Sequence, residues 1–168
     1  MPSQSQDPEH GMLSAYLGSQ RRHVLGILEG LDDDALASSV LPSGWTPLGL
    51  VQHLALDVEH FWFTCVMAGD HDAIARLDEV QNAWVVADGT SPSAVLERYR
   101  TETERAVQLA EGMSLDEAPA WWPEFFGDWR RDNQREVMLH VLGETATHAG
   151  HLDAARELID GRQWRVLT

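Results

Sequence analysis

The chain has 168 residues, of which 43% are hydrophobic, and it carries a formal net charge of −15. A chain of this length is most simply a single domain, 1–168, that can bury a sizeable core without disulfides. The negative charge argues against nucleic acids and anionic membrane surfaces as partners, because proteins bind these mainly through clustered Lys and Arg. We therefore expect neither a nucleic acid nor a membrane partner.

The chain start and its single cysteine bear on the cellular compartment. Residues 1–10 contain no basic segment leading into an apolar run, so they do not read as a signal peptide, and we expect a loosely ordered tail there. No window approaches the roughly 18 uninterrupted apolar residues of a membrane span. Cys65 has no second cysteine to pair with, which is compatible with a reducing cytoplasm. We expect a cytoplasmic protein.

Hydrophobic spacing predicts two helices in the first half of the chain. Apolar residues at helical spacing predict a first helix from about Met12 to about Gly30. The pair Thr46-Pro47 predicts the start of a second helix, with the hydroxyl as N-cap and proline at the first helical position. This helix should run to about Gly69, and it is apolar over most of its circumference, as is typical of a central helix.

The second half predicts two more helices separated by an aromatic connection. Ser91-Pro92 repeats the cap-plus-proline signal for a third helix, whose charged face, including Glu102, should be solvated surface. Residues 113–133 are rich in Trp and Phe without helical periodicity, which predicts a packed flap or a pocket wall. A fourth helix should run from about Gln134 to Asp160. With no strand-like alternation, we expect an all-α antiparallel four-helix bundle with an aromatic-rich loop before its last helix.

The last predicted helix carries four groups that could bind a metal or transfer a proton. His140, Glu144, His148 and His151 recur at spacings of four, four and three, and at about 100° per residue they share one side of the helix. An apolar stripe runs beside them, so they face the edge of the core. Burying three imidazoles and a carboxylate is costly unless a partner satisfies them. A divalent metal would do so.

A second polar arc lies on the otherwise apolar second helix, where His53, Asp57 and His60 are four and three residues apart. If the second and fourth helices face each other in the bundle, His53, Glu144 and His148 supply three ligands. Three protein ligands leave a coordination position open, as catalytic sites do. The pattern alone also allows two simpler interpretations. His53 could be a histidine whose hydrogen bonds are satisfied in the core, and Glu144 could merely be hydrogen-bonded to His148.

Two segments carry a resemblance to a known family. Ser43-Gly-Trp-Thr-Pro-Leu-Gly-Leu-Val-Gln-His53-Leu54 and Glu144-Thr-Ala-Thr-His148-Ala-Gly-His151-Leu-Asp-Ala-Ala-Arg-Glu-Leu-Ile-Asp-Gly161 resemble the DinB-like four-helix proteins. More narrowly, they are similar to the small actinobacterial-type branch linked to mycothiol-dependent enzymes such as maleylpyruvate isomerase. The resemblance extends from about Leu13 to Gly161.

The resemblance implies a metal-binding bundle, often dimeric, with His53, Glu144 and His148 as the ligands. Many DinB-like members have a histidine in place of Glu144, whereas the mycothiol-linked type has a glutamate, so this difference favours that branch. His151 and Asp57 are then neighbours that could orient a ligand or a bound water. The position of His140, two turns before His148, predicts a place on the flank of the site.

The predicted function is a metal-dependent thiol S-transferase of the mycothiol type, in which a bound divalent metal activates a low-molecular-weight thiol for attack on a small electrophile. Cys65 should face away from His53, so the cosubstrate supplies the nucleophile. Activated water would instead make the same site a hydrolase, and a non-enzymatic, stress-associated metal-binding bundle is the third alternative. The ligand set suits zinc, nickel or ferrous iron. We expect zinc, because thiol activation needs no redox change, and a homodimer.

Overall fold

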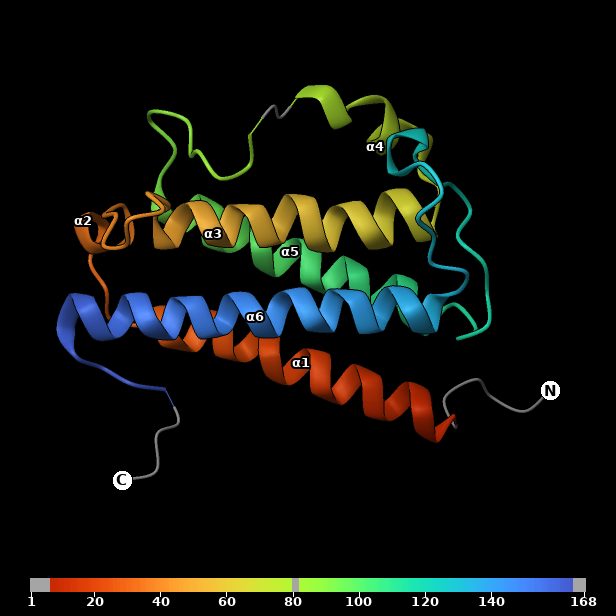
Figure 1. Cartoon of the computed structure of the whole chain (residues 1–168), viewed down its shortest axis with the longest axis horizontal. Helices are drawn as coiled ribbons and strands as arrows, with labels where there is room; N and C mark the ends of the chain where they lie inside the picture. Colours follow the sequence, from red (N-terminus) through yellow and green to blue (C-terminus); the bar gives the residue numbers. More distant parts are fainter. Residues whose placement is uncertain (1–6, 80–81, 165–168) are drawn as a thin grey trace.

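The computed structural model describes residues 7–79 and 82–164, and its regular elements are helical (Figure 1). No β-strand occurs within those two ranges, in agreement with the predicted all-α class. No helix among the described residues is long and apolar enough to cross a lipid bilayer. The elements in chain order are α1 (Pro8–Leu28), α2 (Asp33–Leu36), α3 (Pro47–His53), η2 (Leu54–Met67), α4 (His71–Ala75), η3 (Leu77–Glu79), α5 (Pro92–Glu111), η4 (Glu124–Phe126) and α6 (Gln134–Asp160).

Four long segments form the expected bundle, with two running in each direction. In Figure 1, α1 and α6 run one way, while α3, continued directly by η2, and α5 run the other way. α1 packs on α6, η2 packs on both α5 and α6, and α3 contacts α5. Consecutive segments α3/η2 and α5 are parallel because the connector between them returns along the bundle to its starting end. The connector therefore runs beside the α3/η2 segment, which carries His53.

Short polar caps start the helices where the sequence predicts them. The hydroxyl of Thr46 accepts a hydrogen bond from the Gly49 N–H at 3.0 Å at the start of α3. The hydroxyl of Ser91 caps α5 in the same way, accepting from the N–H of Ala94 at 3.2 Å. Each cap satisfies a backbone donor that has no partner within its helix. α6 ends at Gly161, whose φ of 77° lies in the left-handed region that glycine adopts without strain.

The first helix begins earlier than predicted. Asp7 caps it by accepting the N–H of Glu9 at 2.9 Å, and Pro8 occupies its first position. Residues 8–10 are therefore helical, which corrects this part of the expected tail, while residues 1–6 lie outside the described chain.

η2 is a π-helix, which has more residues per turn than an α-helix. At its end, for example, the Ala68 N–H donates to the carbonyl of Phe63, five residues earlier. Successive side chains along η2 therefore rotate by less than they would in an α-helix. Asp57, about one turn after His53, stays beside it, whereas His60 turns towards α5 and bonds there. The predicted His53, Asp57 and His60 arc is thus divided between two places.

A buried ion pair joins α1 to η2 inside the apolar core. The guanidinium of Arg21 donates from Nε and Nη2 to the two carboxylate oxygens of Glu59, at 2.7 and 2.6 Å. The two side chains are 10% and 0% exposed. Burial raises the pKa of Glu59, and the Arg21 contact opposes that rise. Because both charges have left water, each depends on the other for compensation.

We predict that removing one member of this pair destabilises the bundle more than removing both. Glu59→Leu leaves the Arg21 charge buried and unpaired, which costs about 3–5 kcal/mol in the free energy of unfolding. The double substitution Arg21→Met with Glu59→Leu should recover most of that loss, as measured by urea denaturation. Truncation of the exposed Arg100 and Glu97 pair is the control and should change stability little. A double variant as unstable as Glu59→Leu would contradict this account.

Candidate metal centre

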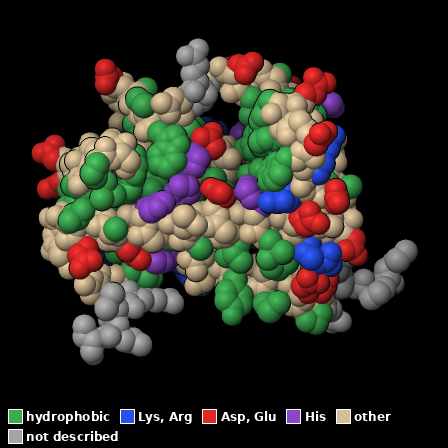
Figure 2. Space-filling model, in the orientation of Figure 1, with side chains coloured by type: hydrophobic (Ala, Val, Ile, Leu, Met, Phe, Trp, Pro, Cys, Tyr) green, Lys and Arg blue, Asp and Glu red, His purple; other side chains and the backbone are tan. Residues whose placement is uncertain are grey.

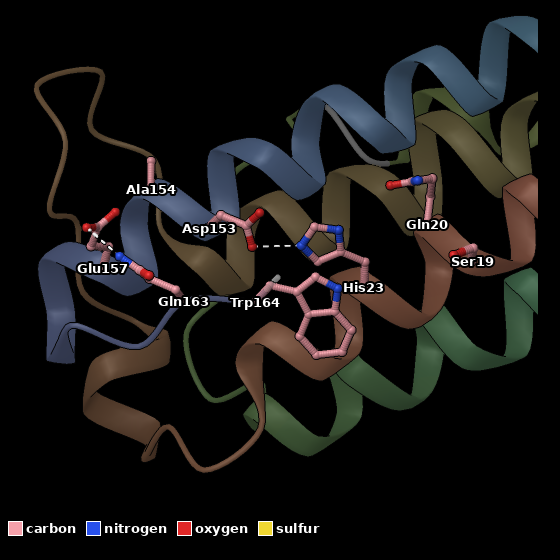
Figure 3. A pocket seen from close by; sticks show the side chains of 8 residues that line it. All are labelled: Ser19, Gln20, His23, Asp153, Ala154, Glu157, Gln163 and Trp164. Carbon is pink, nitrogen blue, oxygen red and sulfur yellow. Dashed lines mark hydrogen bonds and ion pairs between the residues drawn. The ribbon is translucent and has the colours of Figure 1, made fainter. Parts of the chain in front are cut away.

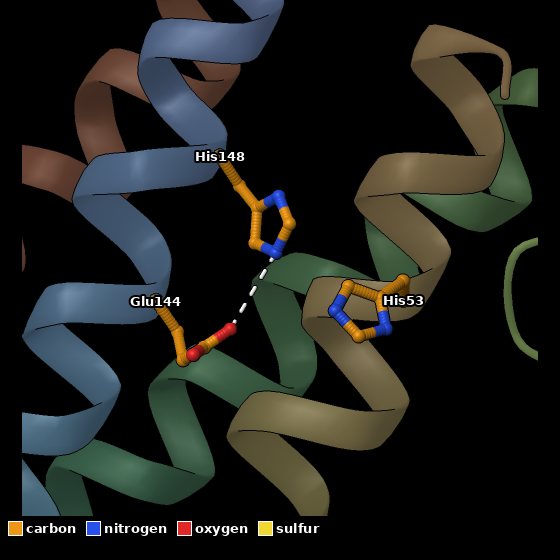
Figure 4. A group of neighbouring side chains, drawn as sticks. All are labelled: His53, Glu144 and His148. Carbon is orange, nitrogen blue, oxygen red and sulfur yellow. Dashed lines mark ion pairs between the residues drawn. The ribbon is translucent and has the colours of Figure 1, made fainter. Parts of the chain in front are cut away.

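Three side chains from two helices meet between α3 and α6. His53 is the last residue of α3, and Glu144 and His148 lie one turn apart on α6 (Figure 4). Each offers one donor atom, and the three atoms lie within 4.8 Å of one another. The two imidazoles are 14% and 12% exposed and the Glu144 carboxylate 41%. The group is therefore half-buried, with its carboxylate edge open to solvent.

Both histidines turn the same ring nitrogen towards the centre of this group. His53 Nδ1 lies 2.8 Å from Asp57 Oδ2, a geometry in which the ring N–H donates to the carboxylate. Its other nitrogen, Nε2, is left for the group, and Figure 4 shows one ring nitrogen of His53 pointing towards Glu144 and His148. His148 Nδ1 similarly lies 3.3 Å from Nδ1 of His151. Asp57 and His151 thus contact the two rings from behind and orient them. The Asp57 carboxylate accepts, so it holds the proton of His53 on Nδ1, whereas either ring can be the donor in the contact between His148 and His151.

The surroundings favour neutral imidazole at His148. Burial lowers the pKa of His148, and the neighbouring His53 lowers it further, while the Glu144 carboxylate acts in the opposite direction. Since a histidine must be neutral to bind a metal, this shift favours the form that can act as a ligand.

The donor set fits a divalent transition metal. His148 Nε2 and Glu144 Oε2 are 3.5 Å apart, and ligand atoms about 2.0–2.2 Å from zinc stand roughly 3–4 Å from each other. The full spread of 4.8 Å among the three donors requires a small inward movement. The partly exposed Glu144 side chain has room to make it. Two imidazoles and one carboxylate are a common set for zinc, nickel or ferrous iron.

Trp84 covers this group, although nothing in its sequence context indicated such a role. Its ring stacks on His53 with centroids 4.2 Å apart and meets the His148 ring edge-on at 5.5 Å. Two residues of α3 hold the Trp84 segment in place. Gln52 Nε2 donates to the carbonyls on either side of it, of Ala83 at 2.8 Å and Val85 at 3.1 Å. Glycine at position 49 admits the Trp84 carbonyl, which would lie 2.2 Å from an added Cβ.

Two other predicted candidates lie outside the group. His60 Nδ1 is 2.9 Å from Glu102 Oε2 on α5, and Arg98 Nε donates to the other oxygen of that carboxylate at 2.6 Å. Glu102 is consequently buried, which corrects its assignment to the solvated face. His140 meets Trp62 and Trp129 edge-on, at centroid distances of 4.7 and 5.6 Å, on the flank predicted for it.

The aromatic connection before α6 packs as a wall beside His140. Trp122, Phe126 and Trp129 all contact Trp62 of η2 at a centroid distance of 5.8 Å. Phe125 beside them remains 72% exposed. In Figure 2, histidine and acidic side chains form a band across the middle of one face, with hydrophobic side chains gathered on both sides of it. The polar group is thus bordered by apolar surface.

A separate cavity of about 370 Å³ lies between α1 and the end of α6 (Figure 3). In it, His23 Nε2 is 2.7 Å from Asp153 Oδ1, and the Trp164 ring stacks on His23 at 5.0 Å. The pair connects α1 to α6 on another side of α6 from Glu144. Among the described residues, His53, Glu144 and His148 are the one group of three or more His, Cys, Asp or Glu side chains able to share an ion.

The comparisons with known proteins bear on the family of the chain. A family model described as mycothiol-S-transferase matches residues 12–161, a span that includes His53, Glu144 and His148. No curated protein matches the sequence. The family match covers most of the chain and agrees with the resemblance carried by the two sequence segments. The chain belongs to the mycothiol S-transferase family.

Proposed function

We propose that this protein is a metal-dependent thiol S-transferase that joins a low-molecular-weight thiol of the mycothiol type to a small electrophile. His53, Glu144 and His148 hold the metal, which we take to be zinc. The observation that carries the proposal is the approach of these three donors from two helices to within 4.8 Å. The family match supports the choice of a thiol over water as the activated group, and therefore a transferase over a hydrolase.

The ligand arrangement suits catalysis better than a structural role. Three protein donors leave a position open, and a divalent metal held there lowers the pKa of a coordinated thiol so that thiolate is available at neutral pH. The sulfur electron pair forms the new carbon–sulfur bond while another bond to the same carbon breaks. Its electron pair departs with a leaving group, or, in an addition, stays on the electrophile and takes up a proton from solvent. The thiol proton passes to solvent, to which the edge with Glu144 is open.

The residues around the ligands have separate tasks in this proposal. Asp57 keeps the proton of His53 on Nδ1. His151 contacts Nδ1 of His148 and helps to orient that ring. Trp84 shields one face of His53 from water. The wall of Trp62 and Trp129 offers apolar surface to the electrophile. The bundle thereby separates a polar reaction centre from an apolar binding surface.

We predict that the protein binds about one equivalent of zinc through these three side chains. At a free metal concentration about 100 times Kd, binding adds about 2.7 kcal/mol of stability, which raises Tm by roughly 5–10 °C. His53→Ala, Glu144→Ala and His148→Ala should each remove most of that rise and the thiol-conjugating activity. His71→Ala changes an exposed histidine on α4 and serves as the control. Conjugating activity that survives in metal-free His148→Ala would refute the proposal.

Asp57 should matter to metal affinity without being a ligand. Asp57→Ala removes the acceptor that holds the His53 ring, and we expect a loss of about 10–100-fold in zinc affinity, measured by competition with a coloured chelator. Asp57→Asn keeps an acceptor oxygen and should lose less. Glu97→Ala, an exposed acidic residue of α5, controls for the change in net charge. Equal affinity in Asp57→Ala and wild type would show that the hydrogen bond does not support the site.

Cys65 should take no part in the chemistry. Its side chain is buried, and desolvation, followed by the charges of Asp70 and Glu102, raises its pKa to about 11. It is therefore protonated at neutral pH and inaccessible. Iodoacetamide should label the native protein slowly and the urea-unfolded protein completely, and Cys65→Ala should keep most of the conjugating activity. Loss of activity in a folded, zinc-loaded Cys65→Ala variant would assign the nucleophile to the chain.

The predicted homodimer and cytoplasmic location remain predictions. They concern the oligomeric state and the cellular location of the protein, and neither is needed for the chemistry proposed for the metal centre.

A further inference from the structure

Three residues of α3 lie side by side where this helix meets the connector. Gly49 and Gln52 precede His53 by four residues and by one, and at about 100° per residue the three lie within roughly 100° of the helix circumference. Both Gly49 and Gln52 approach the backbone around Trp84. This side of α3 therefore presents a candidate metal ligand and two contacts to the connector next to each other.

Gln52 and Gly49 fix the backbone of residues 83–85 against α3. The Gln52 amide carries two N–H groups, and it donates to the carbonyls of Ala83 at 2.8 Å and Val85 at 3.1 Å, the residues on either side of Trp84. At position 49, an added Cβ would lie 2.2 Å from the Trp84 carbonyl oxygen, closer than such atoms approach. Any larger residue there would push the Trp84 backbone away from the helix. Gly49 and Gln52 thus form a seat for Trp84.

The Trp84 ring reaches both histidines of the candidate metal centre. It lies nearly parallel to the His53 ring, with 18° between the planes and 4.2 Å between the centroids. It meets the His148 ring at 67° and 5.5 Å. His53 is therefore held on one face by Trp84 and at Nδ1 by Asp57, and the two contacts together limit rotation of its ring. One connector residue thus contacts ligand candidates from two different helices.

The stack between Trp84 and His53 should be stronger when His53 binds a metal. An imidazole that shares an electron pair with a cation becomes electron-poor, and the electron-rich face of an indole attracts such a ring. Groups that orient a metal-binding histidine from outside the ligand shell commonly change metal affinity by about 10–100-fold. Trp84 contacts the face of the His53 ring, whereas Asp57 contacts its edge, so the two contacts complement each other.

We propose that Trp84 is a positioning residue of the metal centre, and that Gly49 and Gln52 act through it by seating Trp84 against His53 and His148. The inference rests on the proposed function for the presence of a metal, whereas the seat belongs to the chain itself. It gives a role to two residues of the segment 43–54 that the ligand set leaves without one. α3 then carries both a ligand and the support that orients it.

The first test uses the metal-free protein and observes the His53 ring by NMR. A ring stacked on an indole has proton resonances shifted upfield by the indole ring current, and the His53 resonances can be assigned by their absence from His53→Ala. Most of this shift should disappear in Trp84→Ala. A large part should disappear in Gln52→Ala and in Gly49→Ala, in which Trp84 is present but has lost its seat. Trp84→Phe keeps an aromatic ring and should lose less.

Two matched variants control for changes in the connector and in a helix. Val85→Ala truncates the exposed residue next to Trp84. Gly11→Ala adds a Cβ to a helical glycine that has no heavy atom within 4 Å of the new group. Both should keep the His53 shift of wild type. An unchanged shift in Trp84→Ala, or in both Gln52→Ala and Gly49→Ala, would overturn the proposal.

The second test measures zinc affinity by competition with a coloured chelator. Trp84→Ala should bind zinc about tenfold more weakly than wild type, and Trp84→Phe should lose less. Gln52→Ala should also bind more weakly. The double variant of Gln52→Ala with Trp84→Ala should be no weaker than Trp84→Ala alone, because Gln52 acts through Trp84, whereas independent structural losses would multiply. Unchanged affinity in Trp84→Ala, or losses that multiply in the double variant, would overturn the proposal.

These measurements distinguish failure of this proposal from failure of the proposed function. Zinc binding of equal strength in wild type and Trp84→Ala overturns the positioning role alone. A wild type that binds no zinc overturns the proposed function and the positioning role together. Neither measurement depends on the conjugation of a thiol, so a zinc-loaded wild type without transferase activity would overturn the proposed function alone.

Discussion

The candidate site depends on one packing constraint, the register between α6 and the α3/η2 segment. His53 and His148 are almost a hundred residues apart in the chain, yet their rings lie 5.1 Å from each other. If one helix were shifted along the other by one turn, about 5.4 Å, these two rings would no longer meet. The register is set by apolar packing on both helices and by the Arg21 and Glu59 pair, which ties η2 to α1. α1 in turn packs along α6.

Each of the two histidines of the candidate site is supported by a group that belongs to the same local segment. Asp57 holds His53 from one turn further along its own helix, and His151 holds His148 from three residues further along α6. Even Trp84, which comes from the connector, is fastened to α3 by Gln52. The two halves of the site are therefore organised separately, and helix packing brings them together. Such preorganisation limits what the protein must rearrange to bind a metal.

Much of this arrangement could be predicted from the sequence, for identifiable reasons. The helix starts at Thr46 and Ser91 follow from cap-plus-proline pairs, and the Asp7-Pro8 pair carried the same signal for the early start of α1. The spacing of Glu144 and His148 already placed them on one face of a helix. Their proximity to His53 needed only the assumption that two particular helices face each other.

The parts that were missed depend on the path of the chain in three dimensions. The π-helical geometry of η2, which directs His60 to Glu102, leaves no mark in hydrophobic periodicity. The sequence predicts a surface position for Glu102 because it does not show the partners of this carboxylate. These are His60 on η2 and Arg98, one turn earlier on α5. Trp84 lies in a connector, and hydrophobic periodicity does not predict the path of a connector, so its stacking on His53 could not be predicted. Each of these contacts lies near the site, where long-range geometry decides which side chains meet.

The central claim is that His53, Glu144 and His148 bind a metal at which the thiol cosubstrate is activated. Zinc-edge X-ray absorption of the loaded protein, recorded before and after addition of mycothiol, tests it most directly. The account predicts a nitrogen and oxygen shell with two imidazoles in the resting protein, and a new sulfur neighbour at about 2.3 Å once the thiol is added. A zinc shell without imidazole, or one that gains no sulfur at saturating thiol, would contradict it.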